Sequence, residues 1–231
     1  MKIMTFNTQH CLNYVEGKID FEIMAEAIKK CAPDIVGLNE MRGKGASEEY
    51  LEQVEILSNL TGIENYFFAK AVDMKGGPYG NGLLSKIPFA NIQKIMIPDP
   101  NPRTGNKYYE TRCLIKAELE NGLTVLVTHF GLNEDEQVNA VKTILENLKT
   151  DKCVLIGDFN VNPDDPVLKP IKERMKDTFE NIKEKKLSFP SINPDCKIDY
   201  VFVSKDIRVI TADIPEIIAS DHRPHTAEIE F

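Results

Sequence analysis

Short apolar segments that end in polar, chemistry-bearing residues constrain this sequence more than any other feature. The segment from Lys2 to Phe6 is followed by Asn7, and Cys153 to Ile156 is followed after one glycine by Asp158. The full set beside such segments is Asn7, Glu40, His129, Asp158, Asn160, Asp221 and His222. Because side chains at strand ends of a sandwich can meet on one rim, we expect this set to converge.

The spacing of apolar residues predicts where helices separate the strands. An apolar stripe at helical spacing over residues 21–31 follows Asp20, a predicted N-cap. A second helix is expected from Ser47 to just before Gly62. Further helices are expected after Asn133, with a capping-box partner at Glu136 and a core stripe at Val138, Val141, Leu145 and Leu148, and after Asp165, with Pro166 at the first turn.

The remaining apolar segments read as strands. They are residues 34–38, 66–69, 82–85, 91–97, 111–119, 123–128, 198–203, 207–212 and 226–231. Asn121-Gly122 between two of them predicts a hairpin, because the type I′ turn needs positive φ at both positions. Roughly ten strands and four helices alternate irregularly, so we predict an α+β fold in which two sheets pack face to face beneath outer helices. No linker is visible, and residues 1–231 are expected to form one domain.

Composition excludes several classes of protein. Hydrophobic residues make up 42% and charged residues 28%, which is ordinary for a globular chain and not for a disordered one. No apolar run reaches the roughly 20 residues of a membrane span. The net charge of −8 argues against a non-specific DNA binder.

The apolar start of the chain breaks at Asn7, so no export signal is expected and a cytoplasmic location is predicted. The five cysteines are dispersed without a C-x-x-C pair, which favours reduced thiols.

The converging residues would suit a divalent cation and a phosphate. A carboxylate beside a buried strand is costly unless it is paired or binds a cation. Mg²⁺ takes oxygen ligands and needs only one or two carboxylates, and imidazoles would add charge or protons for a phosphate. Each residue alone has an ordinary explanation: a single histidine after a strand is usually structural, and Asp-x-Asn is usually a turn.

Seven segments in order resemble the motifs of one family. They are Thr5-Phe6-Asn7, Val36-Gly37-Leu38-Asn39-Glu40, Gly80-Asn81-Gly82-Leu83-Leu84-Ser85-Lys86-Ile87-Pro88, Thr128-His129-Phe130, Gly157-Asp158-Phe159-Asn160, Lys197-Ile198-Asp199-Tyr200-Val201 and Ser220-Asp221-His222-Arg223-Pro224. The family is the endonuclease/exonuclease/phosphatase superfamily, and Asn39 stands where its motif has Gln. The resemblance implies a DNase I-like four-layer αββα sandwich and a metal-dependent phosphoesterase using Mg²⁺ or Mn²⁺.

The same resemblance implies roles for individual residues. Glu40 would be the main metal ligand, with Asn7 and Asp221 close by. Asp158 would position or deprotonate the attacking water, and Asn160 would orient the water and the phosphate. His222, held by Asp199, would stabilise the phosphorane or move a proton, and His129 would donate to a phosphoryl oxygen or to the leaving group.

Other residues leave alternatives open. Asn81 lies in a segment that is either a turn or the cleft rim, and Asn7, Asn81 and Arg112 are candidate substrate contacts. Arg112 either pairs with an acid at its strand start or contacts a phosphate. In the loop from Pro98 to Tyr109, Arg103 and Lys107 could meet an anionic substrate. His225 and Cys11 are expected to be structural, and the run from Lys183 to Lys186 is expected to be a solvated surface.

The family resemblance does not specify the substrate, because members of this superfamily cleave many phosphoesters. Asn7 is followed by no V-N-G-x-R segment, and Arg223 stands where repair nucleases tend to have Cys, so DNA repair is disfavoured. We expect a small or lipid-like phosphoester, cut as a diester or a monoester, by a monomer that does not insert into membranes. A DNA or RNA nuclease is the alternative enzyme, and a non-catalytic binding or regulatory module is the other alternative.

Overall fold

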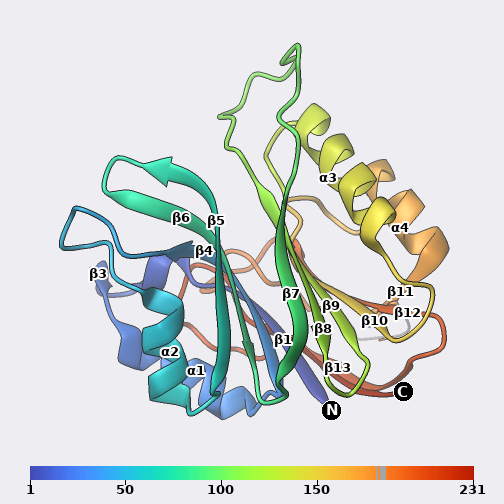
Figure 1. Ribbon diagram of the computed structural model, residues 1–231, viewed down its shortest axis with the longest axis horizontal. Helices are drawn as coiled ribbons and strands as arrows, with labels where there is room; N and C mark the ends of the chain where they lie inside the picture. The colour runs from blue at the N-terminus through green and yellow to red at the C-terminus, as the bar shows by residue number, and fades with distance from the viewer. Residues whose placement is uncertain (181, 183–185) are drawn as a thin grey trace.

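Two six-stranded mixed sheets pack face to face in the computed structural model, which describes residues 1–180, 182 and 186–231 (Figure 1). The first sheet has the order β13-β14-β1-β4-β6-β5 and the second β11-β12-β10-β9-β8-β7. The first comprises β1 (Lys2–Asn7), β4 (Ile35–Arg42), β5 (Asn65–Met74), β6 (Gly77–Ser85), β13 (Arg208–Asp213) and β14 (His225–Glu230). The second comprises β7 (Phe89–Met96), β8 (Cys113–Leu119), β9 (Thr124–His129), β10 (Cys153–Asp158), β11 (Met175–Asp177) and β12 (Asp199–Ser204).

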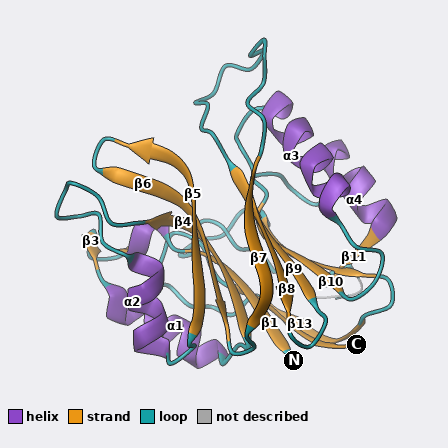
Figure 2. Cartoon of the chain, in the orientation of Figure 1, coloured by secondary structure: helices purple, strands orange, loops and turns teal. Residues whose placement is uncertain are grey.

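Helices cover the outer faces of both sheets (Figure 2). Those on the first sheet are α1 (Phe21–Cys31) and α2 (Gln53–Thr61), and those on the second are α3 (Glu134–Asn147) and α4 (Lys169–Arg174). Short elements complete the described chain: η1 (Gln9–Cys11), the pair β2 (Leu12–Asn13) and β3 (Lys18–Ile19), and η2 (Pro166–Leu168). The four-layer αββα arrangement expected from the sequence is therefore confirmed.

Three apolar clusters hold these layers together. The first lies between the sheets and includes Ile3, Val127 and Ile156, all fully buried. The second joins the first sheet to α1 and α2, and the third joins the second sheet to α3 and α4. The central strands β1, β9, β10 and β12 therefore bury both faces, which explains why their sequences are mostly apolar rather than alternating. The outer strands β5, β7 and β13 keep exposed residues.

Helix starts follow the predicted capping residues. The side chain of Asp20 accepts a hydrogen bond from the backbone N–H of Ile23 at 3.1 Å, which caps α1. Asn133 and Glu136 form the reciprocal capping box of α3. Asp165 caps η2, which leads into α4. In each case the side-chain oxygen satisfies a backbone N–H that the first helical turn leaves without a partner.

Two predictions about helices are wrong. The helix α2 begins at Gln53 and not at Ser47, because Tyr50 is buried against Gly76 of the β5–β6 turn and holds the preceding segment in a loop. In α3 the predicted core stripe is wrong at Val138, which is 52% exposed, whereas Val141 is buried and Leu145 and Leu148 pack against the third cluster. Ala140 and Ile144 complete the buried face. The small Ala140 lets the helix approach the sheet closely, and hydrophobicity alone does not reveal that preference.

Two further observations concern the surface. No helix among the described residues is long and apolar enough to cross a membrane. In the lysine-rich run predicted to be solvated, residues 183–185 lie outside the described residues.

Candidate active site

Strand register in the second sheet aligns three of the predicted site residues. Asp158 at the end of β10 pairs with His129 of the parallel β9 and with Asp199 of the antiparallel β12. Directly paired residues in neighbouring strands project from the same face of a sheet. The second sheet thus presents one imidazole and two carboxylates in a row toward the first sheet, and all three side chains are buried.

The first sheet contributes Asn7 and Glu40 from the ends of β1 and β4. The amide nitrogen of Asn7 donates to Glu40 Oε1 at 3.1 Å and to Asp158 Oδ2 at 3.0 Å. The bond to Asp158 links the two sheets at the site, and the bond to Glu40 joins neighbouring strands of the first sheet. Asn39, the residue before Glu40, adds a second link, because its amide donates to the Thr128 carbonyl at 2.8 Å and accepts from the Asp158 backbone N–H at 3.0 Å.

Unusual backbone conformations gather around these residues. Glu40 has φ of 63° where the β4–β6 register shifts, so a bulge re-aims its side chain. Asn160 has φ of 53°, and the three residues of η1, which begins two positions after Asn7, also have positive φ. Such conformations are costly for residues other than glycine and concentrate at functional sites. The backbone strain therefore marks the same location as the side-chain chemistry.

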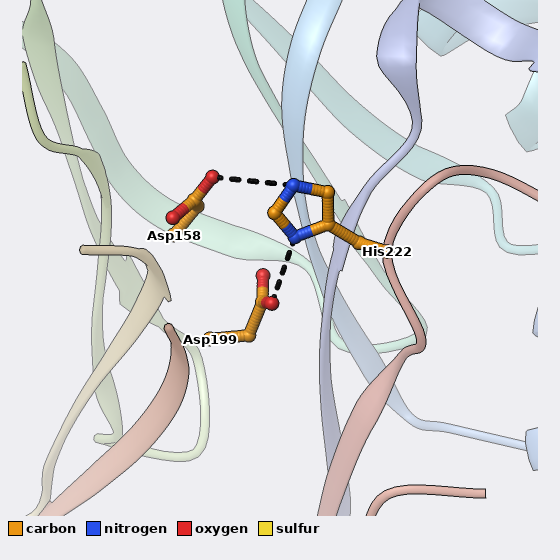
Figure 3. A group of neighbouring side chains, drawn as sticks. All are labelled: Asp158, Asp199 and His222. Carbon is orange, nitrogen blue, oxygen red and sulfur yellow. Dashed lines mark hydrogen bonds and ion pairs between the residues drawn. The ribbon is translucent and has the colours of Figure 1, made fainter. Parts of the chain in front are cut away.

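His222 lies between two carboxylates (Figure 3). Its Nδ1 is 2.8 Å from Asp199 Oδ2, and its Nε2 is 3.7 Å from Asp158 Oδ2. Burial by itself lowers the pKa of His222, but the two carboxylates outweigh burial and raise this pKa above the usual range. The candidate ligand atoms of Asp158, Asp199 and His222 lie within 4.8 Å of one another, so this group could hold a metal ion.

Asp158 is the common neighbour of the polar groups at the site. Its carboxylate accepts hydrogen bonds from Asn7 Nδ2 at 3.0 Å and from the Asn160 backbone N–H at 2.9 Å. Burial raises the pKa of Asp158, while the charge on His222 lowers it. One proton is shared between Asp158 and His222, and we assign it to His222, because Asp199 stabilises the imidazolium from behind and the two donors stabilise the ionised Asp158.

His129 approaches Asp158 from another direction and has a different partner behind it. Its Nε2 is 3.5 Å from Asp158 Oδ2, and its Nδ1 is 2.9 Å from Arg112 Nη1. Arg112 in turn forms an ion pair with Glu110. Burial and the charges of Arg112 and His222 hold the pKa of His129 well below its usual range. His129 is therefore a neutral imidazole.

Glu40 and Asp221 form the carboxylate side of the site. Asp221 accepts a hydrogen bond from the Ser220 hydroxyl at 2.9 Å. Burial raises the pKa of Asp221, and Glu40 adds to this rise, so the two carboxylates lie near enough to repel. Glu40 also raises the pKa of Tyr79, after burial. Two half-buried carboxylates that repel each other suit a divalent cation, which would relieve the repulsion.

The other candidates lie around this centre. Asn160 donates its amide to the Phe130 carbonyl at 2.9 Å. Asn81 is 2% exposed and lies behind the site, where it accepts from Asn39 at 2.8 Å and donates to the Cys113 carbonyl at 2.9 Å. His225 is buried and bonded to Thr178 and to the Asp199 carbonyl. The inter-sheet role of Asn39 was missed, and only its place beside Glu40 could have indicated it.

Comparisons with known proteins concern the family and the fold of the chain. A model of the Endonuclease/Exonuclease/phosphatase family matches residues 4–222. No curated protein matches the chain. Among solved structures, a Bacteroides thetaiotaomicron mannosyl-6-phosphatase is 16% identical with a TM-score of 0.81, covering 100% of both chains.

Two further structures show the same fold. A Beutenbergia cavernae endonuclease/exonuclease/phosphatase is 22% identical with a TM-score of 0.77, covering 99% of this chain and 71% of its own. The human Nocturnin catalytic domain with bound sulfate anion is 18% identical with a TM-score of 0.73, covering 100% of this chain and 94% of its own.

Proposed function

Because the chain belongs to the endonuclease/exonuclease/phosphatase family, we propose that it is a divalent-metal-dependent phosphoesterase that hydrolyses a phosphodiester or a phosphomonoester. The observation that carries the proposal is the position of Asp158, whose carboxylate lies between two imidazoles and beside the Asn7 amide. An ionised carboxylate next to hydrogen-bond donors of this kind can accept a proton from water while the donors stabilise charge on a phosphoryl group.

We assign the cation to Asn7, Glu40 and Asp221, with Mg²⁺ or Mn²⁺ as the ion. The mutual repulsion of Glu40 and Asp221 supports this placement. The alternative group of Asp158, Asp199 and His222 fits less well, because both ring nitrogens of His222 face carboxylates and an imidazolium has no lone pair for a metal. When bound, the ion would neutralise charge that develops on the phosphoryl oxygens.

Each of the protein's own residues has a separate role in the proposed reaction. Asp158 accepts a proton from the attacking water as the water oxygen bonds to phosphorus in line with the departing ester oxygen. Asn160 orients the water and the phosphate through its amide. The His222 imidazolium, held by Asp199 at 2.8 Å, stabilises the added negative charge. His129 donates a hydrogen bond to a phosphoryl oxygen.

The proposed substrate is a small or lipid-like phosphoester. The acidic net charge of −8 supports this over a long polyanion such as DNA. The Bacteroides neighbour named as a mannosyl-6-phosphatase supports including a hexose 6-phosphate among the substrates tested. A nuclease activity is the competing outcome.

A hydrolysis panel tests this proposal. The panel would compare an aryl phosphodiester, an aryl phosphomonoester, mannose 6-phosphate, a phospholipid and plasmid DNA, each with Mg²⁺ and with Mn²⁺. We expect turnover of at least one small or lipid substrate and its loss in Asp158→Asn, a variant of nearly the same shape. Turnover of DNA alone would favour the nuclease, and no metal-dependent turnover of any panel substrate would contradict the proposal.

A further inference from the structure

The side chain of Arg112 points into the protein and not toward solvent. It is 13% exposed, and that of its ion-pair partner Glu110 is 12% exposed. Its Nη1 lies 2.9 Å from His129 Nδ1, on the side of the ring away from Asp158. A phosphate at Asp158 would therefore meet His129 and not the guanidinium.

The chemistry of the guanidinium determines which nitrogen of His129 carries the proton. An arginine side chain only donates hydrogen bonds and does not lose its proton in proteins. His129 Nδ1 must therefore be the acceptor and carry a lone pair. A neutral imidazole has one N–H, which is consequently at Nε2, the atom 3.5 Å from Asp158 Oδ2. The lowered pKa of His129 agrees with a neutral ring.

Arg112 is held in place by a chain of contacts that reaches α3. The backbone N–H of Glu110 donates to Glu136 Oε1 at 3.2 Å. Glu136 Oε2 accepts from the backbone and the side chain of Asn133 in the capping box of α3. The segment that carries Glu110, the ion-pair partner of Arg112, is thus anchored to an element outside the site.

We propose that Arg112 is a positioning residue that holds His129 as the Nε2–H tautomer, so that His129 presents a single N–H to a phosphoryl oxygen beside Asp158. The assignment of a phosphoryl oxygen rests on the proposed phosphoesterase function; the assignment of the tautomer does not. In the opposite tautomer His129 would direct a lone pair at an oxygen that is gaining negative charge. That arrangement would be repulsive in the transition state.

Nitrogen NMR of the histidines tests the tautomer directly. The chain has four histidines, and His129→Gln identifies the signals of His129 by their disappearance. We expect His129 in the wild type to show a protonated Nε2 and an unprotonated Nδ1, with and without Mg²⁺. A protonated Nδ1 in the wild type would overturn the proposal without any further variant.

Variants of Arg112 supply the second test. Arg112→Met removes the donor and should abolish the single-tautomer signature, while Arg112→Lys, which keeps a charge and a donor, should restore it. On the best panel substrate, Arg112→Met should lower kcat about 10–100-fold with KM within about threefold, and the lysine variant should recover part of the rate.

Arg208→Met is the matched control, because Arg208 pairs with Glu230 on an exposed strand edge. It should change neither the spectrum of His129 nor kcat. An Arg112→Met protein with the wild-type tautomer and kcat would overturn the proposal, as would a rise in KM at constant kcat, which would make Arg112 a substrate contact. If no panel substrate is turned over, the proposed activity fails while the spectrum still decides the tautomer.

Discussion

The two imidazoles on either side of Asp158 occupy almost equivalent positions yet carry different charges. His129 Nε2 and His222 Nε2 lie 3.5 Å and 3.7 Å from the same Asp158 oxygen, and both rings are buried. Behind His222 stands the Asp199 carboxylate, and behind His129 stands the Arg112 guanidinium. Burial lowers the pKa of both rings. The carboxylates at His222 outweigh this and raise its pKa, whereas Arg112 lowers the pKa of His129 further.

This difference shows that the second partner of each ring, and not its burial or its distance from Asp158, sets its protonation. In this site the cationic imidazole can stabilise negative charge on one side of a phosphate, and the neutral imidazole can orient the phosphate from the other side. Each imidazole obtains its state from the residue at its other ring nitrogen, Arg112 for His129 and Asp199 for His222.

Removal of the divalent cation should have the largest effect. A chelator should abolish phosphoester hydrolysis, and Mg²⁺ or Mn²⁺ should restore it, because no side chain replaces the charge that Glu40 and Asp221 are proposed to hold. The protonation of the two imidazoles comes from protein groups and should persist in the stripped enzyme. Undiminished turnover in chelator, measured with the panel substrates, would refute the metal dependence.

Removal of the cationic imidazole should have the next largest effect. His222→Ala should lower kcat about 10²–10⁴-fold, or about 3–5 kcal/mol, and leave KM little changed, since the imidazolium acts on the transition state. Asp199→Asn keeps the shape but removes the charge behind His222, and should reproduce most of that loss. A His222→Ala enzyme with near-normal kcat would contradict the proposed mechanism.

A third buried histidine provides a control for the comparison. Among the described residues the ring nitrogens of His225 meet two neutral hydrogen-bond partners, Thr178 and the Asp199 carbonyl. Burial, with a smaller effect of Lys197, lowers the pKa of His225 from the ordinary histidine value of 6.5 to about 4. Between these pH values the unfolded chain binds a proton that the folded chain does not, so the free energy of unfolding should fall as pH decreases through this window.

His225 should lower the free energy of unfolding by about 3 kcal/mol across this pH window, at about 1.4 kcal/mol for each pKa unit. Urea unfolding at several pH values would measure it. In His225→Gln this part of the pH dependence should vanish, although the variant starts less stable. If the free energy of unfolding changes with pH equally in the wild type and the variant, His225 titrates normally in the folded protein.

An exposed arginine should have the smallest effect and sharpen the contrast with Arg112. Arg103 is 53% exposed, lies 3.9 Å from Asp99, and stacks on the Tyr109 ring at 4.7 Å. Arg103→Ala and Lys107→Ala should raise KM for an anionic substrate at most a few-fold, and only at low salt, because exposed charges are screened. A loss of kcat in either variant, measured across a salt series, would place this loop at the reacting phosphate.

The sequence permitted prediction of the elements that local chemistry controls. The caps at Asp20 and Asn133 and the hairpin at Asn121-Gly122 were predictable because each depends on residues a few positions apart. The predicted type I′ turn is wrong, since only Gly122, with φ of 86°, and not Asn121 has a positive φ. The start of α2 was not predictable, since it depends on Tyr50 packing against a hairpin 26 residues further along the chain. The residues gathered at the site were named from strand ends and motifs. The Asp199–His222 pair was expected from the family resemblance, but the Arg112–His129 contact and the Asn7–Asp158 bond between the sheets were not.

By itself, the sequence determined which side chains the site would contain and that two sheets would pack beneath helices, because apolar periodicity and residue chemistry are local properties. Only the tertiary structure decided that Arg112 stands behind His129, whereas Asp199 behind His222 was already expected from the family resemblance and is found there. Those pairings arise from strand register and a loop between β13 and β14, and they join residues 17 and 23 positions apart. Since a few ångströms decide whether a ring faces a guanidinium or a carboxylate, its protonation follows from the packed fold and not from the motif that contains it.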